Sequence, residues 1–343
     1  MVSVTYSQRL GPISEAQLQA ALDRFGLGRL VSAAPIPFGL FGQNVFVNST
    51  HGAYILRGAP HYDWQLPAEQ FFARLLHERT AAPTPWPYLL DPADAIFGWS
   101  YALMPRLPGR PLADPAVPEA LTDDDLHGIA RALGVTLAEL QTLRWPHAGR
   151  YDHDTGTIAP FATSYGAWVI ERIDQLLASI RTHSSQTTAD DLVWIRQVLE
   201  QAASALAEPL EPRFVMEDYT PYNTTAEPTD AGWRISGVFD LMTAHFGDGE
   251  ADLSRSTAIF LDRDPALAAS FLRAYLEQTT PRPGFAARFP AYMLYDRLII
   301  WEYLERAAPG WQEQPQTLRA WAEPYVGALA QPDLGRCIDR LRD

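Results

Sequence analysis

The sequence predicts an α+β fold with two lobes, a small β-rich N-terminal lobe and a larger, mainly helical C-terminal lobe. Three observations support this. Short runs of β-forming residues are concentrated between about residues 31 and 103. A stretch rich in proline and glycine follows, from residue 105 to 118, and is typical of a linker. Beyond it, apolar residues recur with the spacing of amphipathic helices. We therefore expect lobes over residues 1–104 and 105–343.

The N-terminal lobe is predicted to contain two helices and three strands. A capping box formed by Ser14 and Gln17 begins a helix that runs to about Leu27. Short β-type runs over residues 45–48, 54–56 and 99–103 predict the strands. The apolar stripe of residues 66–79 predicts a helix between the second and third strands.

The C-terminal lobe is predicted to be built from helices. They cover about residues 122–143, 165–180, 189–206, 265–278, 285–305 and 317–329. Only residues 213–215 and 233–239 have the pattern of strands in this half. Because ligands commonly bind where two lobes meet, we expect the functional site at their junction.

Composition excludes several classes of protein. The 343 residues carry a formal charge of −14, which argues against a nucleic-acid partner. We find no apolar run of the length, about 18 residues, that a membrane span needs, and no signal peptide at the N-terminus. The single cysteine, Cys337, excludes an internal disulfide. We therefore expect a cytoplasmic protein without a membrane partner, either a monomer or a homodimer.

All 27 basic residues other than histidine are arginines, so the chain contains no lysine. This excludes Schiff-base chemistry, a lysine-containing phosphate loop and a lysine general base. Arginine stays protonated in proteins, so the remaining cations can only hold and stabilise negative charge.

The most informative segment contains Asp218, Asn223 and Asp240. Asp218 follows a short apolar run, Asn223 comes five residues later, and Asp240 ends a second apolar strand. Phosphoryl transfer to a hydroxyl needs a carboxylate that orients the hydroxyl and accepts its proton, and oxygen ligands for Mg²⁺. Asp218 fits the first role, and Asn223 and Asp240 fit the second. The alternative reading of any single aspartate here is a cap or a turn former.

This ordered set, with Gly247-Asp248-Gly249-Glu250-Ala251-Asp252-Leu253 after it, resembles the aminoglycoside phosphotransferase family. The family's catalytic loop reads His-Gly-Asp with Asn five residues later, its metal segment contains Asp, and a Gly-Asp-Pro-x-x-Asp-Leu segment follows. The resemblance covers about residues 30–260 and implies a bilobal protein-kinase-like fold. It also implies that Asp252 supports the catalytic loop.

The N-terminal half agrees with this resemblance. The turn with Gly39 and Gly42, followed by Asn44, resembles the family's nucleotide-covering turn, although two glycines between strands also make an ordinary hairpin. Arg57 stands where the family places its phosphate-clamping cation, and the resemblance implies that Glu69 orients it. The alternatives are an edge-strand arginine and a solvated helical glutamate.

Met104 begins a segment that resembles the family's hinge, where backbone groups meet the adenine ring, although Met104 also suits a core position. The resemblance implies a phosphotransferase that moves a phosphoryl group from Mg²⁺-ATP, or GTP, to a hydroxyl of a small molecule. An aminoglycoside-like antibiotic and an amino-alcohol or sugar metabolite are both open as acceptors.

Two positions depart from the family pattern. The family's histidine and glycine before the catalytic aspartate are Met216 and Glu217 here. Glu217 can tune the neighbouring Asp218, bind a cationic substrate, or face solvent. Gln141 replaces another histidine of the family, and we assign it no chemistry. These departures motivate the alternative function, a non-catalytic nucleotide-binding sensor or binding module.

The acceptor of this family binds in the helical lobe. The region after Asp252 is rich in aromatic and acidic residues, which suit a cationic acceptor. We select Asp296 as the best candidate for an acceptor contact and His245 as a second candidate. Their alternative readings are a helix core position and a structural hydrogen-bonding histidine.

Overall fold

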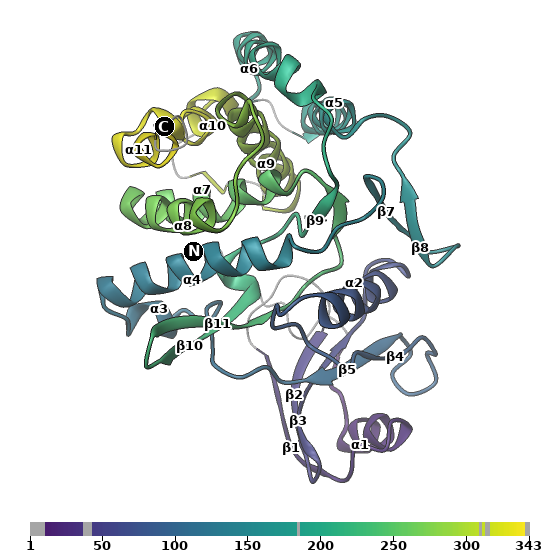
Figure 1. The fold of residues 1–343 in the computed structure, drawn as a ribbon. Helices are drawn as coiled ribbons and strands as arrows, with labels where there is room; N and C mark the ends of the chain where they lie inside the picture. The colour runs from purple at the N-terminus through teal and green to yellow at the C-terminus, as the bar shows by residue number, and fades with distance from the viewer. Residues whose placement is uncertain (1–10, 37–42, 184–185, 309–310, 313–315, 340–343) are drawn as a thin grey trace.

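The computed structural model describes residues 11–36, 43–183, 186–308, 311–312 and 316–339. The N-terminal region forms an antiparallel five-stranded sheet with the order β1-β2-β3-β5-β4. Its strands are β1 (Leu30–Pro35), β2 (Gln43–Ser49), β3 (Gly52–Gly58), β4 (Leu89–Asp91) and β5 (Tyr101–Pro105). The sheet lies at the bottom of Figure 1 and the helical region above it, which confirms the predicted α+β fold class.

The sheet is covered on both faces because its side chains alternate along each strand. Tyr101 and Leu103 of β5 pack in a cluster with helix α1 (Glu15–Arg24), whereas Ala102 and Met104 join the main core with helix α2 (Gln65–Arg79). The predicted capping box is present at the start of α1. Helix α2 thus lies between the sheet and the rest of the molecule (Figure 1).

The C-terminal region is dominated by helices. They are α3 (Ala116–Glu119), α4 (Asp123–Leu140), α5 (Tyr165–His183), α6 (Ala189–Ala207), α7 (Leu253–Arg263), α8 (Pro265–Gln278), α9 (Phe285–Ala307), α10 (Leu318–Val326) and α11 (Pro332–Asp339), with 3₁₀ turns η1 (Pro221–Asn223), η2 (Gly249–Asp252) and η3 (Ala328–Ala330). Helix α9 contacts α5, α6, α7 and α10. Helices α4 and α8 approach closely at Gly134, where a Cβ atom would lie 2.4 Å from the backbone oxygen of Phe271.

The prediction of only two strands in this half is wrong, because two further sheets are present. One has the order β11-β10-β6, from β6 (Arg110–Pro111), β10 (Thr224–Thr229) and β11 (Gly232–Val238). The other has the order β8-β7-β12-β9, from β7 (Gly149–Asp152), β8 (Thr157–Pro160), β9 (Arg213–Val215) and β12 (His245–Gly247). Most of these strands have two to four residues, too few for a period-two pattern.

Both small sheets position the segments that carry the candidate site. Strand β9 leads directly into residues 216–223, and β11 ends two residues before Asp240. A backbone hydrogen bond of 3.1 Å from the Phe239 N–H to the Asn223 carbonyl joins the two segments. Residues far apart in sequence are thereby placed side by side.

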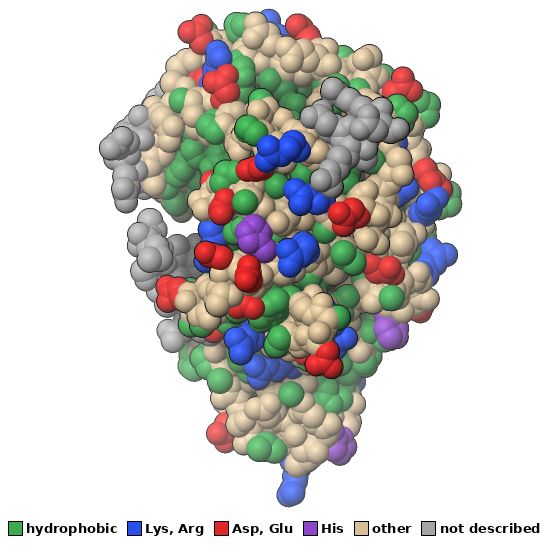
Figure 2. All heavy atoms as spheres, turned by 60° about the vertical axis from the view of Figure 1, so that its left-hand side comes forward, with side chains coloured by type: hydrophobic (Ala, Val, Ile, Leu, Met, Phe, Trp, Pro, Cys, Tyr) green, Lys and Arg blue, Asp and Glu red, His purple; other side chains and the backbone are tan. Residues whose placement is uncertain are grey.

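The molecule's charges are mixed on the face drawn in Figure 2, where arginines and carboxylates intermingle over the wide helical region. The acidic excess of the chain is therefore not gathered into one patch on that face. None of the described helices is long and apolar enough to span a bilayer.

Candidate active site

The side chain of Asp252 accepts hydrogen bonds from the backbone of residues 216 and 217. Its Oδ2 accepts a hydrogen bond of 2.6 Å from the Met216 N–H, and its Oδ1 accepts one of 2.8 Å from the Glu217 N–H. Asp252 is only 2% exposed, and burial raises its pKa to about 7. The loop that carries Asp218 is therefore held by a buried carboxyl group, as the family resemblance implies.

Asp218 presents a carboxylate whose two oxygens each accept a hydrogen bond. Oδ2 accepts one of 2.9 Å from the Asn223 side-chain amide, and Oδ1 accepts one of 2.8 Å from Nη1 of Arg255. The side chain remains 40% exposed, so a hydroxyl group can reach it. Burial raises the pKa of Asp218, and the charge of Arg255 opposes this shift.

Asn223 and Asp240 provide oxygen atoms near Asp218. The Asn223 amide nitrogen points to the side chain and to the backbone carbonyl of Asp218, 3.0 Å away, which turns its Oδ1 in the other direction. Asp240 adopts a left-handed backbone conformation with φ of 68°. Burial raises its pKa, and the positive charge of Arg57 lowers it. An outward amide oxygen and a carboxylate fit Mg²⁺, which prefers hard oxygen ligands.

Arg57 and Glu69 are brought together as the resemblance implies. Nε of Arg57 lies 2.9 Å from Oε2 of Glu69, and its Nη2 donates to Oδ1 of Asp240 at 2.7 Å. Glu69 is 1% exposed and also accepts hydrogen bonds from the Tyr88 hydroxyl and from the backbone N–H groups of Asp240 and Leu241. Glu69 thus fixes both the cation and the segment of the candidate metal ligand.

The remaining nucleotide-side candidates lie on the sheet or outside the described residues. Gly39 and Gly42 fall outside the described residues. Asn44 pairs with Arg57 across β2 and β3, and its buried Oδ1 has no hydrogen-bond partner among the described residues. Met104, on β5, is 4% exposed and lies opposite Ile55 of β3. The unpartnered Oδ1 of Asn44 is an acceptor and suits a donor group of a ligand, whereas the guanidinium of Arg57 is the group on this side that can hold a phosphate oxygen.

Glu217 and His245 occupy a cluster behind Asp218. Glu217 has φ of 68°, accepts a hydrogen bond of 2.7 Å from the Tyr295 hydroxyl, and lies 3.6 Å from Nη2 of Arg150. Burial would raise its pKa, but Arg150 and other neighbours hold it below its ordinary value. His245 is fully buried, its Nε2 lies 3.2 Å from the Tyr165 hydroxyl, and burial lowers its pKa to about 4. The imidazole is therefore neutral and enclosed.

Asp296, on α9, is 5% exposed and bonded on both oxygens. Oδ1 accepts a hydrogen bond from Nε of Arg255, and Oδ2 accepts bonds of 2.9 and 2.6 Å from Nε and Nη2 of Arg297. Asp296 is therefore connected to Asp218 through Arg255. Sequence reasoning missed Arg255; its place three residues after Asp252, in a chain without lysine, was the available signal.

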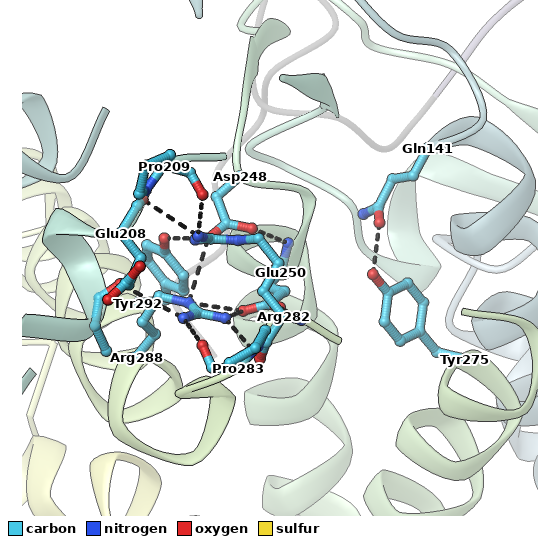
Figure 3. A network of polar contacts seen from close by, with 11 residues as sticks. Gln141, Glu208, Pro209, Asp248, Glu250, Tyr275, Arg282, Pro283, Arg288 and Tyr292 are labelled. Carbon is cyan, nitrogen blue, oxygen red and sulfur yellow. Dashed lines mark hydrogen bonds and ion pairs between the residues drawn. The ribbon is translucent and has the colours of Figure 1, made fainter. Parts of the chain in front are cut away.

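The segment after Asp240 continues into a buried network of charges (Figure 3). Asp248 accepts hydrogen bonds from Arg282 and from the Tyr292 hydroxyl, and Glu250 accepts one of 2.7 Å from the fully buried Arg288. Gln141 donates to the Gly249 carbonyl at 2.7 Å and accepts from the Tyr275 hydroxyl. This network anchors η2, which ends at Asp252.

The fold and this arrangement of groups define a kinase-like phosphotransferase scaffold. The chain belongs to the APH phosphotransferase enzyme family, whose model matches residues 32–288. No curated protein sequence matches it significantly.

Several solved structures share the fold at low sequence identity. A Ralstonia eutropha protein provisionally assigned as an aminoglycoside phosphotransferase is 15% identical, with a TM-score of 0.60 over 96% of this chain and 99% of that one. A Thermobifida fusca protein provisionally assigned as a fructosamine-3-kinase is 18% identical, with a TM-score of 0.61 over 91% and 98%. APH(2″)-IIIa, solved with GDP and kanamycin, is 14% identical, with a TM-score of 0.60 over 96% and 98%.

Proposed function

We propose that this chain transfers the γ-phosphoryl group of Mg²⁺-ATP to a hydroxyl group of a small molecule. The observation that carries the proposal is the convergence of Asp218, Asn223, Asp240 and Arg57. Asp218 and Asn223 lie in the loop after β9, Asp240 follows β11, and Arg57 lies on β3. Hydrogen bonds and ion pairs within the chain orient all four side chains or their backbone. GTP is the alternative cosubstrate, because solved structures of this fold hold GDP as well as ADP.

In the proposed reaction Asp218 orients the acceptor hydroxyl and takes its proton as the oxygen bonds to phosphorus. When bound, Mg²⁺-ATP supplies the phosphoryl group, and ADP leaves. Asn223 and Asp240 hold the metal. Arg57, oriented by Glu69, clamps the phosphate oxygens, since a planar guanidinium matches them geometrically.

The rest of the nucleotide side is proposed from the family pattern. Gly39 and Gly42 cover the phosphates together with Asn44, and the backbone near Met104 meets the adenine ring. We also propose that the protein acts in the cytoplasm as a monomer or homodimer.

The acceptor is proposed to be an aminoglycoside-like compound or an amino-alcohol or sugar metabolite. Kanamycin and hygromycin B are present in solved structures of this fold. The sequence predicts Glu217, His245 and Asp296 as acceptor contacts. Each of these side chains is 15% exposed or less and has a hydrogen-bond partner in the chain. We therefore assign them to support the walls of the site.

The alternative function, a non-catalytic nucleotide sensor, is motivated by Met216 and Glu217. Met216 is fully buried in the main core, so it fills the family's histidine position by packing. Glu217 occupies the family's glycine position with the positive φ that favours glycine there. Neither change removes a group that phosphoryl transfer needs. This favours an active phosphotransferase over a non-catalytic sensor.

Calorimetric titration with ATP, with and without Mg²⁺, tests the proposal. We expect Mg²⁺-dependent binding, loss of that dependence in Asp240→Asn, and retained binding without transfer in Asp218→Asn. Nucleotide binding with no transfer in the unmodified protein would favour the sensor. Failure to bind ATP and GTP under all these conditions would overturn both readings.

A further inference from the structure

Arg150 is a partly exposed cation beside the catalytic loop. It lies on β7, directly opposite His245 of β12, so both side chains emerge on the same face of that sheet. Its guanidinium carbon lies 4.8 Å from the centre of the Trp168 ring, and its side chain is 41% exposed. The indole supports one face of the guanidinium and thereby fixes its orientation.

The hydrogen-bonding capacity of Arg150 is largely unused within the described part of the chain. An arginine carries five N–H donors. The one ion pair found for Arg150 there, with Oε1 of Glu217, is 3.6 Å long, and no hydrogen bond of its side chain is found among the same residues. A planar cation with an open N–H edge suits an oxyanion, which it can bind through two parallel hydrogen bonds.

The negative charge of Glu217 leaves Arg150 able to bind an incoming anionic group. Its Oε1 already accepts a hydrogen bond from Tyr295, and its side chain is 15% exposed. Arg172 of α5 adds a second positive charge that lowers the pKa of Glu217, and its buried Nε has no partner among the described residues. Two arginines thus act on one enclosed carboxylate, which does not neutralise both of them.

The other acids of this region are engaged in internal ion pairs. Asp296 is paired with Arg255 and Arg297, and Asp248 and Glu250 are paired with Arg282 and Arg288 (Figure 3). Few carboxylate oxygens are therefore left for an amine of the acceptor. Arg150, by contrast, keeps 41% of its side chain exposed beside Glu217.

We infer that the acceptor carries an anionic group, a carboxylate or a phosphate, and that Arg150 binds this group while the acceptor hydroxyl lies at Asp218. The inference rests on the proposed function and narrows its substrate class. Nη2 of Arg150 lies 3.6 Å from Oε1 of Glu217, which directly precedes Asp218 in the sequence. Glu217 is then a positioning residue that holds Arg150 and Tyr295 in place.

Matched acceptors test this inference. One set is glycerol, D-glycerate and glycerol 3-phosphate, and another is D-glucitol, D-gluconate and glucose 6-phosphate, with kanamycin as a polycation. Transfer is followed by coupled ADP release, and binding to the protein loaded with Mg²⁺-ADP is followed by calorimetry. The variants are Arg150→Gln, Arg150→Lys and, as a control, Arg319→Gln, which removes a similarly exposed arginine from α10.

We expect an anionic member of a set to be used or bound at least about 10-fold better than its neutral partner, because charge-assisted bonds are the stronger ones. Arg150→Gln should abolish this preference, Arg150→Lys should restore part of it, and Arg319→Gln should leave it unchanged. Comparison of the carboxylate acceptors with the phosphate acceptors shows which of the two anionic groups Arg150 prefers.

Two outcomes would overturn the inference. One is a preference for kanamycin or the neutral alcohols, or a preference for anions that survives in Arg150→Gln. The other is the absence of binding by every anionic member up to about 10 mM, a concentration that corresponds to very weak affinity. Loss of Mg²⁺-ADP binding itself would instead contradict the proposed function, so the two failures are distinguishable.

Discussion

Replacing Asp252 should separate the stability of the catalytic loop from nucleotide binding. Asp252→Ala leaves the backbone N–H groups of Met216 and Glu217 without the acceptors that now lie 2.6 and 2.8 Å away. Each buried donor left without a partner costs about 1–3 kcal/mol, so we expect the free energy of unfolding to fall by about 2–6 kcal/mol. Asp252→Asn keeps one acceptor oxygen and should cost about half as much.

The same change should slow transfer more than it weakens binding. Without Asp252 the left-handed conformation of Glu217 loses its support, and Asp218 moves with it. A displacement of about 1 Å at a reacting group can cost about 100-fold in rate. The affinity for Mg²⁺-ATP should change little, because Asp252 contacts the catalytic loop and not Arg57 or Asp240.

Urea unfolding at about pH 8, where a carboxyl group with a pKa near 7 is ionised, measures the stability change. Coupled ADP release and calorimetry measure the other two quantities. Asp264→Ala is the matched control, because its carboxylate accepts one backbone N–H at the exposed start of α8 and should cost about 0.5–2 kcal/mol. Equal losses in the two alanine variants, or an unchanged rate in Asp252→Ala, would refute the reasoning.

Three further changes have defined outcomes. Arg57→Lys should reduce kcat/KM for Mg²⁺-ATP by at least about 10-fold, because one ammonium group cannot reproduce the contacts to both Glu69 and Asp240; steady-state kinetics equal to those of the unmodified protein would exclude the clamp. Arg255→Met should lower the transfer rate by about 100-fold with nucleotide affinity retained in calorimetry, because Asp218 loses the donor to its Oδ1; a loss confined to nucleotide affinity would contradict this. Burial lowers the pKa of His245 from 6.5 to about 4, so the unfolded chain binds more protons between these values, and stability falls as the pH decreases. Relative to His245→Phe, the unmodified protein should therefore lose about 2 kcal/mol of unfolding free energy between about pH 7.5 and pH 5, measured by urea unfolding, and parallel pH profiles would disprove the assignment.

Long, strongly patterned elements could be predicted from the sequence. The helix predicted over residues 265–278 matches α8, because a proline at its start and a continuous apolar stripe mark both ends. Strand β10 was missed, since Pro228 and Glu227 interrupt its pattern and its pairing with β6 and β11 is supplied by distant segments. Helix α7 was missed because it follows η2 without a side-chain cap.

In the candidate site, too, some residues could be predicted from the sequence and others could not. The candidates on the phosphate side could be selected from their order along the chain, and the structure brings Arg57, Glu69 and Asp240 together. Glu217 could be located by its departure from the family pattern, but the reason for a glycine at that position, a φ of 68°, required the backbone. For Arg255 the sequence offered only its place three residues after Asp252, and for Arg150 it offered no signal, because the partners of both lie in segments that are distant in sequence.

Helix α9 fixes several of these contacts through one spacing. Arg288, Tyr292 and Tyr295 are separated by four and three residues and contact Glu250, Asp248 and Glu217, while Asp296 pairs with Arg255. One inserted or deleted residue between them would rotate the downstream part by about 100° and shift it by about 1.5 Å. Such a change would remove every downstream partner at once. Length variation in this protein should therefore be tolerated in surface loops but eliminated by selection within this stretch of α9.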